Sequence, residues 1–87
     1  MFRVEWISSA VDELANMWLT ADEQSRAAIT VATHVIEQQL KQAPVSIGES
    51  RDRGRRVCFV GPLVVTYEVL DRLRLVTILH VRRIRNY

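Results

Sequence analysis

Apolar and polar residues alternate at the start of the chain, over residues 2–6, where Phe2, Val4 and Trp6 are the apolar ones. Successive side chains of a β-strand point to opposite faces, so a period of two predicts a strand with one apolar face. We therefore expect the chain to open with a strand that places these three side chains against the core.

Two segments with helical spacing follow. The first begins at Ser9, with Asp12 at the spacing of a reciprocal cap partner, and ends near Leu19. The second begins with Thr20 as its predicted cap, followed by carboxylates in the first turn, and Pro44 closes it. Because almost nothing separates the two helices, we expect an antiparallel helical hairpin. Its apolar stripes comprise Val11, Leu14, Ala15 and Trp18 in the first helix and Ala28, Val31, Ala32, Val35, Ile36 and Leu40 in the second.

Residues 42–56 show neither period and predict a long irregular connection. Three apolar runs then predict strands over 57–60, 63–70 and 73–82, and the short gaps between them require antiparallel hairpins. The order β-α-α-β-β-β predicts an α+β fold in which a helical hairpin covers one face of a mainly antiparallel four-stranded sheet. We expect one domain over residues 1–87.

The last strand indicates which of its faces is covered. One face carries residues typical of a core, namely Leu73, Leu75, Leu79 and Val81. The other face becomes polar toward its end and carries Val76, Ile78, His80 and Arg82. We therefore expect His80 and Arg82 to project from the free face of the sheet, which is the face away from the helices.

The face of Glu68 depends on the loop before the last strand. A two-residue loop, Asp71–Arg72, would place Glu68 beside Leu75 and Thr77 and away from His80. A loop that extends through Leu73 would place it on the His80 side. Both alternatives stay open, because a slip of one residue exchanges the two faces.

Charge is divided unevenly along the chain. Residues 1–48 carry three basic and six acidic side chains, whereas residues 49–87 carry nine basic side chains, all arginine, and four acidic ones. Arginine presents a planar fork of donors that binds phosphate or carboxylate at two points. The uneven distribution favours binding of a polyanion or an acidic protein over a merely solvated rim. The clustered arginines are Arg51, Arg53, Arg55 and Arg56 in the connection and Arg82, Arg83 and Arg85 before the terminal Tyr87.

Composition excludes several classes of function. A single cysteine, Cys58, excludes a disulfide framework and predicts a reducing compartment, and its apolar surroundings indicate an inert core thiol. Two histidines and one cysteine are too few for a typical metal site, and no glycine-rich phosphate loop is present, so we expect no metal or other cofactor. No apolar stretch reaches the ~18 residues that suggest a membrane span, so we expect a soluble, cytoplasmic protein with no membrane partner.

The basic end of the chain holds the side chains that metal-free RNA cleavage requires. That reaction needs a base for the 2′-hydroxyl, an acid for the leaving oxygen and cations for the phosphorane. His80 suits proton transfer near neutral pH, Glu68 is a second candidate, and arginine serves only to stabilise charge. Tyr87 could stack on a base.

Several motifs, in this order and spacing, resemble the RelE/ParE superfamily of bacterial type II toxin–antitoxin toxins. They are Val4-Glu5-Trp6 leading into Ser9–Leu14, Leu40–Pro44 followed by Gly48, Val65–Val69, and Ile78–Arg83. The resemblance covers nearly the whole chain. It implies the same α+β fold and a small toxin held inactive by an acidic cognate antitoxin that covers the arginine-bearing surface.

The resemblance leaves the activity open, because one fold carries several functions. RelE-like members cut messenger RNA on the ribosome without a metal, whereas ParE-like members inhibit DNA gyrase. We expect a ribosome-dependent endoribonuclease, with gyrase inhibition or a decayed toxin that only binds antitoxin as alternatives. The assigned roles are acid or base for His80, a further catalytic role for Glu68, phosphorane stabilisation for Arg82 and Arg83, base stacking for Tyr87, and RNA or partner contact for Arg51, Arg53, Arg55, Arg56 and Arg85.

The chain departs from the RelE-like pattern on its central strand. RelE-like members tend to carry a basic residue just before the aromatic position of that strand. Here the corresponding positions are Leu63, Val64 and Val65. This departure is the reason that the ParE-like activity stays an alternative.

Overall fold

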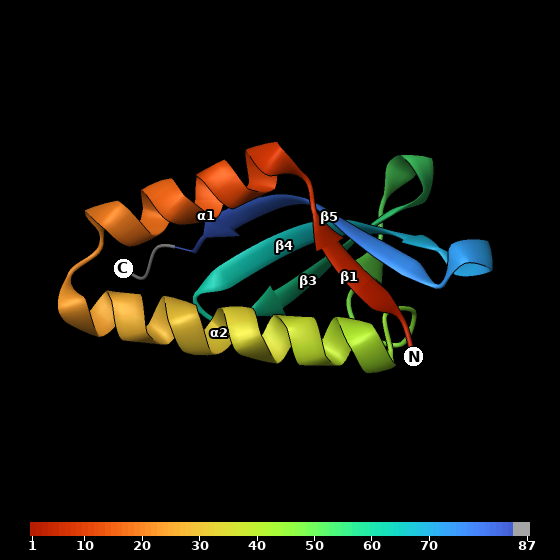
Figure 1. The fold of residues 1–87 in the computed structure, drawn as a ribbon, viewed down its shortest axis with the longest axis horizontal. Helices are drawn as coiled ribbons and strands as arrows, with labels where there is room; N and C mark the ends of the chain where they lie inside the picture. Colours follow the sequence, from red (N-terminus) through yellow and green to blue (C-terminus); the bar gives the residue numbers. More distant parts are fainter. Residues whose placement is uncertain (85–87) are drawn as a thin grey trace.

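The computed structural model describes residues 1–84. They form a five-stranded sheet with two helices packed on it (Figure 1). The predicted order of elements is confirmed, with one short strand added in the connection. The elements are β1 (Arg3–Trp6), α1 (Ser8–Thr20), α2 (Glu23–Gln42), β2 (Glu49–Ser50), β3 (Arg55–Val60), β4 (Leu63–Leu70) and β5 (Leu75–Arg83), with 3₁₀ turns at Asp52–Gly54 and Asp71–Leu73.

The sheet has the order β1-β5-β4-β3-β2, in which only β1 and β5 run parallel. The prediction of a mainly antiparallel sheet is therefore confirmed. Its width was underestimated, because β2 is a two-residue strand inside the segment that showed no period. Strand β3 begins two residues earlier than predicted, at Arg55, because its pairing with β4 already starts at that residue.

Both predicted helix caps are wrong. The amide of Ile7 donates to the carbonyl of Ile78, so pairing with β5 continues to that residue and α1 starts immediately after it, at Ser8, with no side-chain cap. Asp22 caps α2 instead of Thr20, because its carboxylate accepts the amide hydrogen of Ser25 at 2.8 Å. That hydrogen bond is the main cause of a lowered pKa at Asp22. The predicted end of α2 ahead of Pro44 is confirmed.

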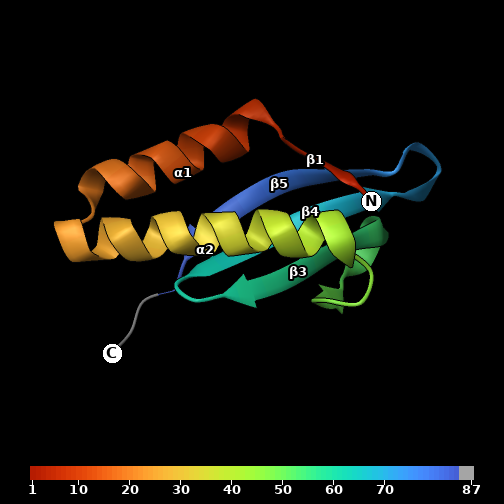
Figure 2. The same ribbon diagram turned by 60° about the horizontal axis from the view of Figure 1, so that its bottom comes forward.

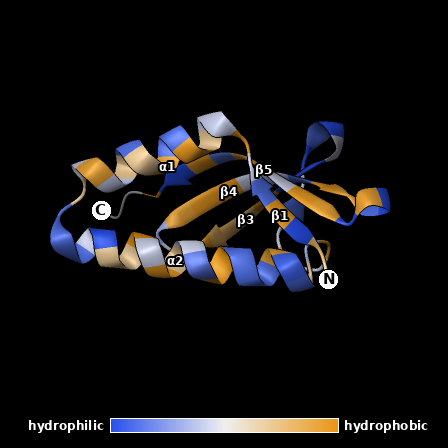
Figure 3. Cartoon of the chain, in the orientation of Figure 1, coloured by the Kyte–Doolittle hydropathy of each residue, from blue (hydrophilic) through white to orange (hydrophobic). Residues whose placement is uncertain are grey.

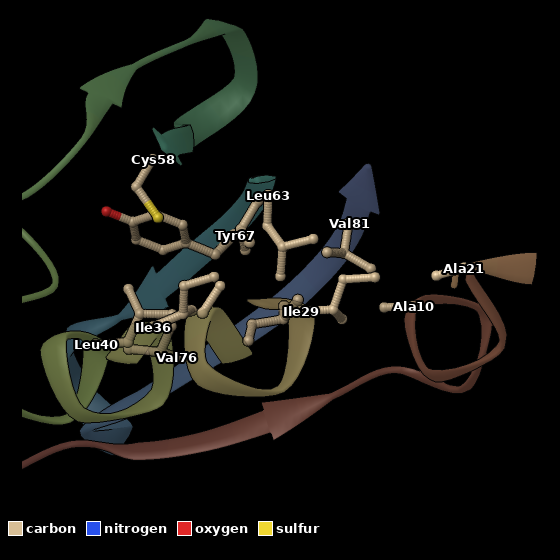
Figure 4. Packing of buried hydrophobic residues seen from close by; sticks show 13 residues of the cluster. Ala10, Ala21, Ile29, Ile36, Leu40, Cys58, Leu63, Tyr67, Val76 and Val81 are labelled. Atoms are coloured by element: carbon tan, nitrogen blue, oxygen red, sulfur yellow. The ribbon is translucent and has the colours of Figure 1, made fainter. Parts of the chain in front are cut away.

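The core lies between α2 and the sheet (Figure 4). The stripe predicted for the second helix is confirmed for Ala32, Ile36 and Leu40 but wrong for Ala28 and Val31, which are exposed. The first strand places its apolar side chains against this core, as predicted. Colouring by hydropathy shows apolar strands behind an α2 that alternates between polar and apolar segments (Figure 3). The buried strand residues are Cys58, Leu63, Val65, Tyr67, Val76, Ile78 and Val81.

An irregularity between β4 and β5 changes which side chains of β5 face the core. Tyr67 pairs with Ile78 and Thr66 pairs with His80, so Leu79 has no residue opposite it. Such a bulge shifts the alternation of the strand by one residue. The predicted core side of β5 was therefore wrong before the bulge, where Val76 and Ile78 are fully buried, and right after it at Val81.

Residues that alternate with the core positions define the free face of the sheet. His80 and Arg82 lie on it, as predicted, because the bulge restores the expected alternation beyond Leu79. Their cross-strand partners share this face, since residues directly opposite each other point the same way. The free face carries Arg55, Val57 and Phe59 of β3, Val64, Thr66 and Glu68 of β4, and Leu75, Thr77, His80 and Arg82 of β5.

The two helices form the predicted antiparallel hairpin but diverge from their connection (Figure 2). Helix α2 lies over the sheet, whereas α1 runs along the end of β5 that extends beyond β1. The stripe predicted as core in α1 is only partly buried. Val11 and Trp18 are 48% and 40% exposed, and Ala10 is the fully buried residue of this helix.

Candidate active site

A small pocket of about 290 Å³ opens where α1 meets the last residues of β5. Its lining consists of Glu13 from α1, Thr66 from β4, and His80 and Arg82 from β5. The pocket exists because β5 continues past the end of β1, which leaves its edge free for α1 to approach. Three chain segments that are far apart in sequence thus meet at one point.

Glu13 joins the helix to the strand at this point. Its Oε1 atom accepts the amide hydrogen of Val81 at 3.1 Å and lies 3.6 Å from Nδ1 of His80. The Glu13 carboxylate therefore accepts a backbone hydrogen bond from the edge of β5 and also faces the imidazole of His80. With Nδ1 turned toward Glu13, Nε2 is the ring nitrogen left for a substrate. The side chain of His80 is half exposed, so a ligand can reach it.

The side chains of Arg82 and Arg83 lie on opposite faces of the sheet. Arg82 shares the free face with His80 and is exposed. Arg83 points to the opposite face, where its Nη2 donates to Oγ of Ser25 at 2.9 Å near the start of α2. The expectation that both guanidinium groups converge on His80 was wrong for Arg83, because adjacent strand residues face opposite ways.

Glu68 lies on the same face as His80. It pairs with Thr77, and its neighbour on this face, Thr66, pairs with His80. Neither predicted loop is present, because Leu70 pairs with Leu75 and four residues connect them. Glu68 shares a face with Leu75 and Thr77, as the shorter loop predicted, and the bulge brings His80 to that face as well.

The arginines of the connection do not form one surface. Arg51 and Arg53 lie at the tip of the β2–β3 hairpin, where Arg51 pairs with Glu49 at 3.0 Å and Arg53 has a φ of +64° in the turn. Arg55 is exposed on the free face, opposite Glu68. Positive charge is thus split between the hairpin tip, the His80 pocket and the start of α2, which corrects the expectation of a single arginine-bearing surface.

Arg56 has a structural role in the described chain. Its Nη2 donates to the carbonyl oxygens of Val45 and Ile47 at 2.8 and 3.2 Å, and its Nη1 donates to Oγ of Ser50 at 2.9 Å. The guanidinium therefore holds the segment between α2 and β3 in place. This arrangement removes Arg56 from the expected set of free phosphate contacts.

Tyr67 holds the same segment from the core side. Its hydroxyl lies 2.8 Å from the carbonyl oxygen of Pro44 and 2.9 Å from that of Ile47. Burial raises the pKa of this phenol. Cys58 is buried nearby, as predicted for a core thiol, and burial raises its pKa to about 11 (Figure 4).

Arg85 and Tyr87 lie outside the described residues. Glu13, by contrast, is a site residue that sequence analysis missed. Its bond to Val81 spans 68 positions, and no local pattern signals such a contact.

Comparison with known proteins rests on structure. No protein-family model matches the chain, and a comparison with curated proteins finds no match. The toxin–antitoxin ParDE structure from P. aeruginosa matches with 19% identity, 98% coverage of both chains and a TM-score of 0.78. The RelBE2 complex from Mycobacterium tuberculosis matches with 18% identity, 94% coverage of this chain, 90% of the other and a TM-score of 0.76. The isolated E. coli RelE toxin matches with 11% identity, 100% and 88% coverage and a TM-score of 0.63.

The chain has the RelE/ParE fold. The resemblance inferred from its motifs is thus confirmed for the architecture, over nearly the full length. The scores do not separate the two activities known for this fold, because a ParDE structure and a RelBE structure match about equally well.

In this RelE/ParE fold the diverging helices enclose an apolar groove of about 540 Å³, which we call the interhelical groove. Trp18, one of its lining residues, has the guanidinium of Arg26 4.5 Å from its ring centre. The apolar stripe of α1, which the sequence predicted as core, lines this groove instead. The lining residues are Val11, Leu14, Ala15, Trp18, Leu19, Ile29, Thr30, Thr33, His34 and Glu37.

Two further expectations concern residues 1–84 as a whole. Within this part of the chain, no group of three or more histidine, cysteine, aspartate or glutamate side chains is arranged to hold a metal ion. Neither helix described there is long and apolar enough to cross a membrane.

Proposed function

We propose that the chain is the toxin of a type II toxin–antitoxin system and that it cleaves messenger RNA on the ribosome. The observation that carries the proposal is the grouping of His80, Arg82 and Glu13 around an open pocket on the free face. An imidazole oriented by a carboxylate, beside a guanidinium on an accessible surface, supplies proton transfer and charge stabilisation together.

The reaction assigns each group one task. Nε2 of His80 takes the proton of a 2′-hydroxyl, and the 2′-oxygen bonds to the adjacent phosphorus. The bond from phosphorus to the 5′-oxygen then breaks, and that oxygen receives a proton from water at the open site. Arg82 stabilises the phosphorane, since a guanidinium does not give up its proton. The products carry a 2′,3′-cyclic phosphate and a 5′-hydroxyl.

The antitoxin is the second part of the proposal. An apolar stripe of an antitoxin helix would fill the interhelical groove, whose walls include Val11, Trp18 and Ile29. Open apolar grooves of this kind suit the apolar face of an amphipathic helix. Two of the matching structures are described as toxin–antitoxin complexes, which supports a protein partner of this class. An acidic segment of the same partner would reach the arginines of the hairpin tip.

Inhibition of DNA gyrase is the second candidate function. It is favoured by the apolar residues Leu63, Val64 and Val65 in β4, at the positions where RelE-like members tend to carry a basic residue. In that case the exposed arginines would bind an acidic protein surface rather than RNA.

Induction of the chain without an antitoxin in bacteria separates these functions. The proposal predicts that translation stops while plasmid supercoiling stays normal, and that His80→Gln restores translation at an equal level of folded protein. Loss of supercoiling with continued translation would show that the chain inhibits DNA gyrase instead. Normal growth with both readouts unchanged would leave a module that only binds antitoxin.

A further inference from the structure

One aromatic side chain on the free face has no role in the core or in the pocket of His80. Phe59 is 58% exposed, although its neighbours Cys58 and Val60 point toward the core. Strand β2 pairs with β3 only as far as Val57, so Phe59 also lies beyond the strand that flanks β3. Burial in this chain therefore does not explain the ring.

Phe59 shares one row of the sheet with a group of the proposed site. It pairs with Val64, and Val64 pairs with Arg82, so the three side chains lie on one face in a line across three strands. Neighbouring strands are spaced by about 4.8 Å, which places the backbones of Phe59 and Arg82 about 10 Å apart. The next row on the same face contains Thr66 and His80.

We infer that Phe59 is a stacking platform for one base of a single-stranded RNA. With the base on the ring, the sugar lies over Val64 and the following phosphate reaches Arg82 and His80. Exposed aromatic rings on a sheet surface bind unstacked bases in this way in single-strand-binding proteins. This inference rests on the proposed function, because it takes RNA to be the ligand of the free face.

The charges at one end of the row suit an anionic group such as the phosphate of a nucleic acid strand. Arg82 and His80 flank one end, and Glu68 lies two rows away on the same face, opposite Arg55. Glu13 faces Nδ1 of His80 and the amide of Val81, and Glu49 pairs with Arg51 at 3.0 Å. Val57 and Val64, which border the ring, are uncharged.

The test measures binding of labelled RNA octamers by fluorescence anisotropy at fixed salt, with the His80→Gln background to prevent cleavage. Each octamer is compared with an abasic octamer that has the same phosphates. Phe59→Leu keeps an apolar strand residue and should weaken binding of the base-containing octamer about 5- to 100-fold, with little change for the abasic one. Phe59→Trp should retain the affinity. Val31→Ala, which changes an exposed apolar residue of α2, should bind as the parent does.

The outcomes separate this inference from the proposed function. Equal binding by Phe59→Leu and the parent would overturn the platform, whatever the chain does to translated message. Absence of any binding by the parent, or an equal loss for both octamers, would overturn it too. Base-dependent loss in a chain that cuts no message would support the platform and contradict the nuclease. An effect of Phe59→Leu on gyrase inhibition alone would assign the ring to a protein partner.

Discussion

The sheet contains two pairs of adjacent arginines, Arg55-Arg56 in β3 and Arg82-Arg83 in β5. In both pairs the two members have different roles. In each pair the first residue is exposed on the free face. The second points to the other face and binds fixed oxygens, which are loop carbonyls for Arg56 and a serine hydroxyl for Arg83. A cluster of arginines in a sequence is therefore not one binding surface. Successive side chains of a strand point to opposite faces, so one arginine of each pair is available to a ligand and the other stabilises the fold.

The largest effect should distinguish the members of the second pair. Arg82→Gln should lower the rate of message cleavage about 100- to 1,000-fold, the usual cost of removing one stabilising donor from a reaction site. Arg83→Gln should leave the rate within a few-fold, because its guanidinium contacts Ser25 on the other face. Single-turnover cleavage on programmed ribosomes measures both. Equal losses in the two variants would mean that Arg82 and Arg83 do not differ in their role in cleavage.

The first pair should differ in stability rather than in rate. Arg56→Gln removes charged hydrogen bonds to the loop, so the free energy of unfolding should fall by about 1.5–3 kcal/mol. Arg55→Gln changes an exposed side chain and should stay within about 0.5 kcal/mol of the parent. Urea unfolding followed by tryptophan fluorescence gives both values. Similar midpoints for the two variants would mean that the loop does not depend on Arg56.

The smallest effect concerns the start of α2, where Arg83 is fixed. The pKa of Asp22 is lowered, chiefly by the amide of Ser25 and last by the charge of Arg83. A carboxylate with a lowered pKa adds stability above its ordinary pKa, which is lost as the pH falls through the lowered one. Asp22→Asn keeps a capping oxygen and should unfold like the parent at pH 7 but lose less stability below pH ~3.8. Urea midpoints at pH 7 and pH 3 provide the test, and an identical acid dependence would contradict it.

The sequence predicts best where one local pattern decides the outcome. Strand β4 was predicted at its observed bounds, because an apolar run is closed by Gly61-Pro62 at one end and Asp71-Arg72 at the other. The order of elements followed from similar signals. These features need no information about what a residue meets across the fold.

The predictions fail where a contact between segments distant in sequence determines the structure. The bulge at Leu79 depends on how β5 pairs with β4, and it reverses the core side of half the strand. Glu13 joins the site only because α1 lies along the free edge of β5. The stripe on α1 has the spacing of core residues, but spacing alone does not tell a core from a groove that a partner fills.

The exposed imidazole and guanidinium of the free face are proposed to cut RNA together. The most direct test of this proposal is to incubate the purified chain with ribosomes that carry a translated message and to map the new RNA ends. We expect cuts with 2′,3′-cyclic phosphate ends that disappear in a folded His80→Gln variant. Intact message with the parent chain, or the same cuts with His80→Gln, would contradict it.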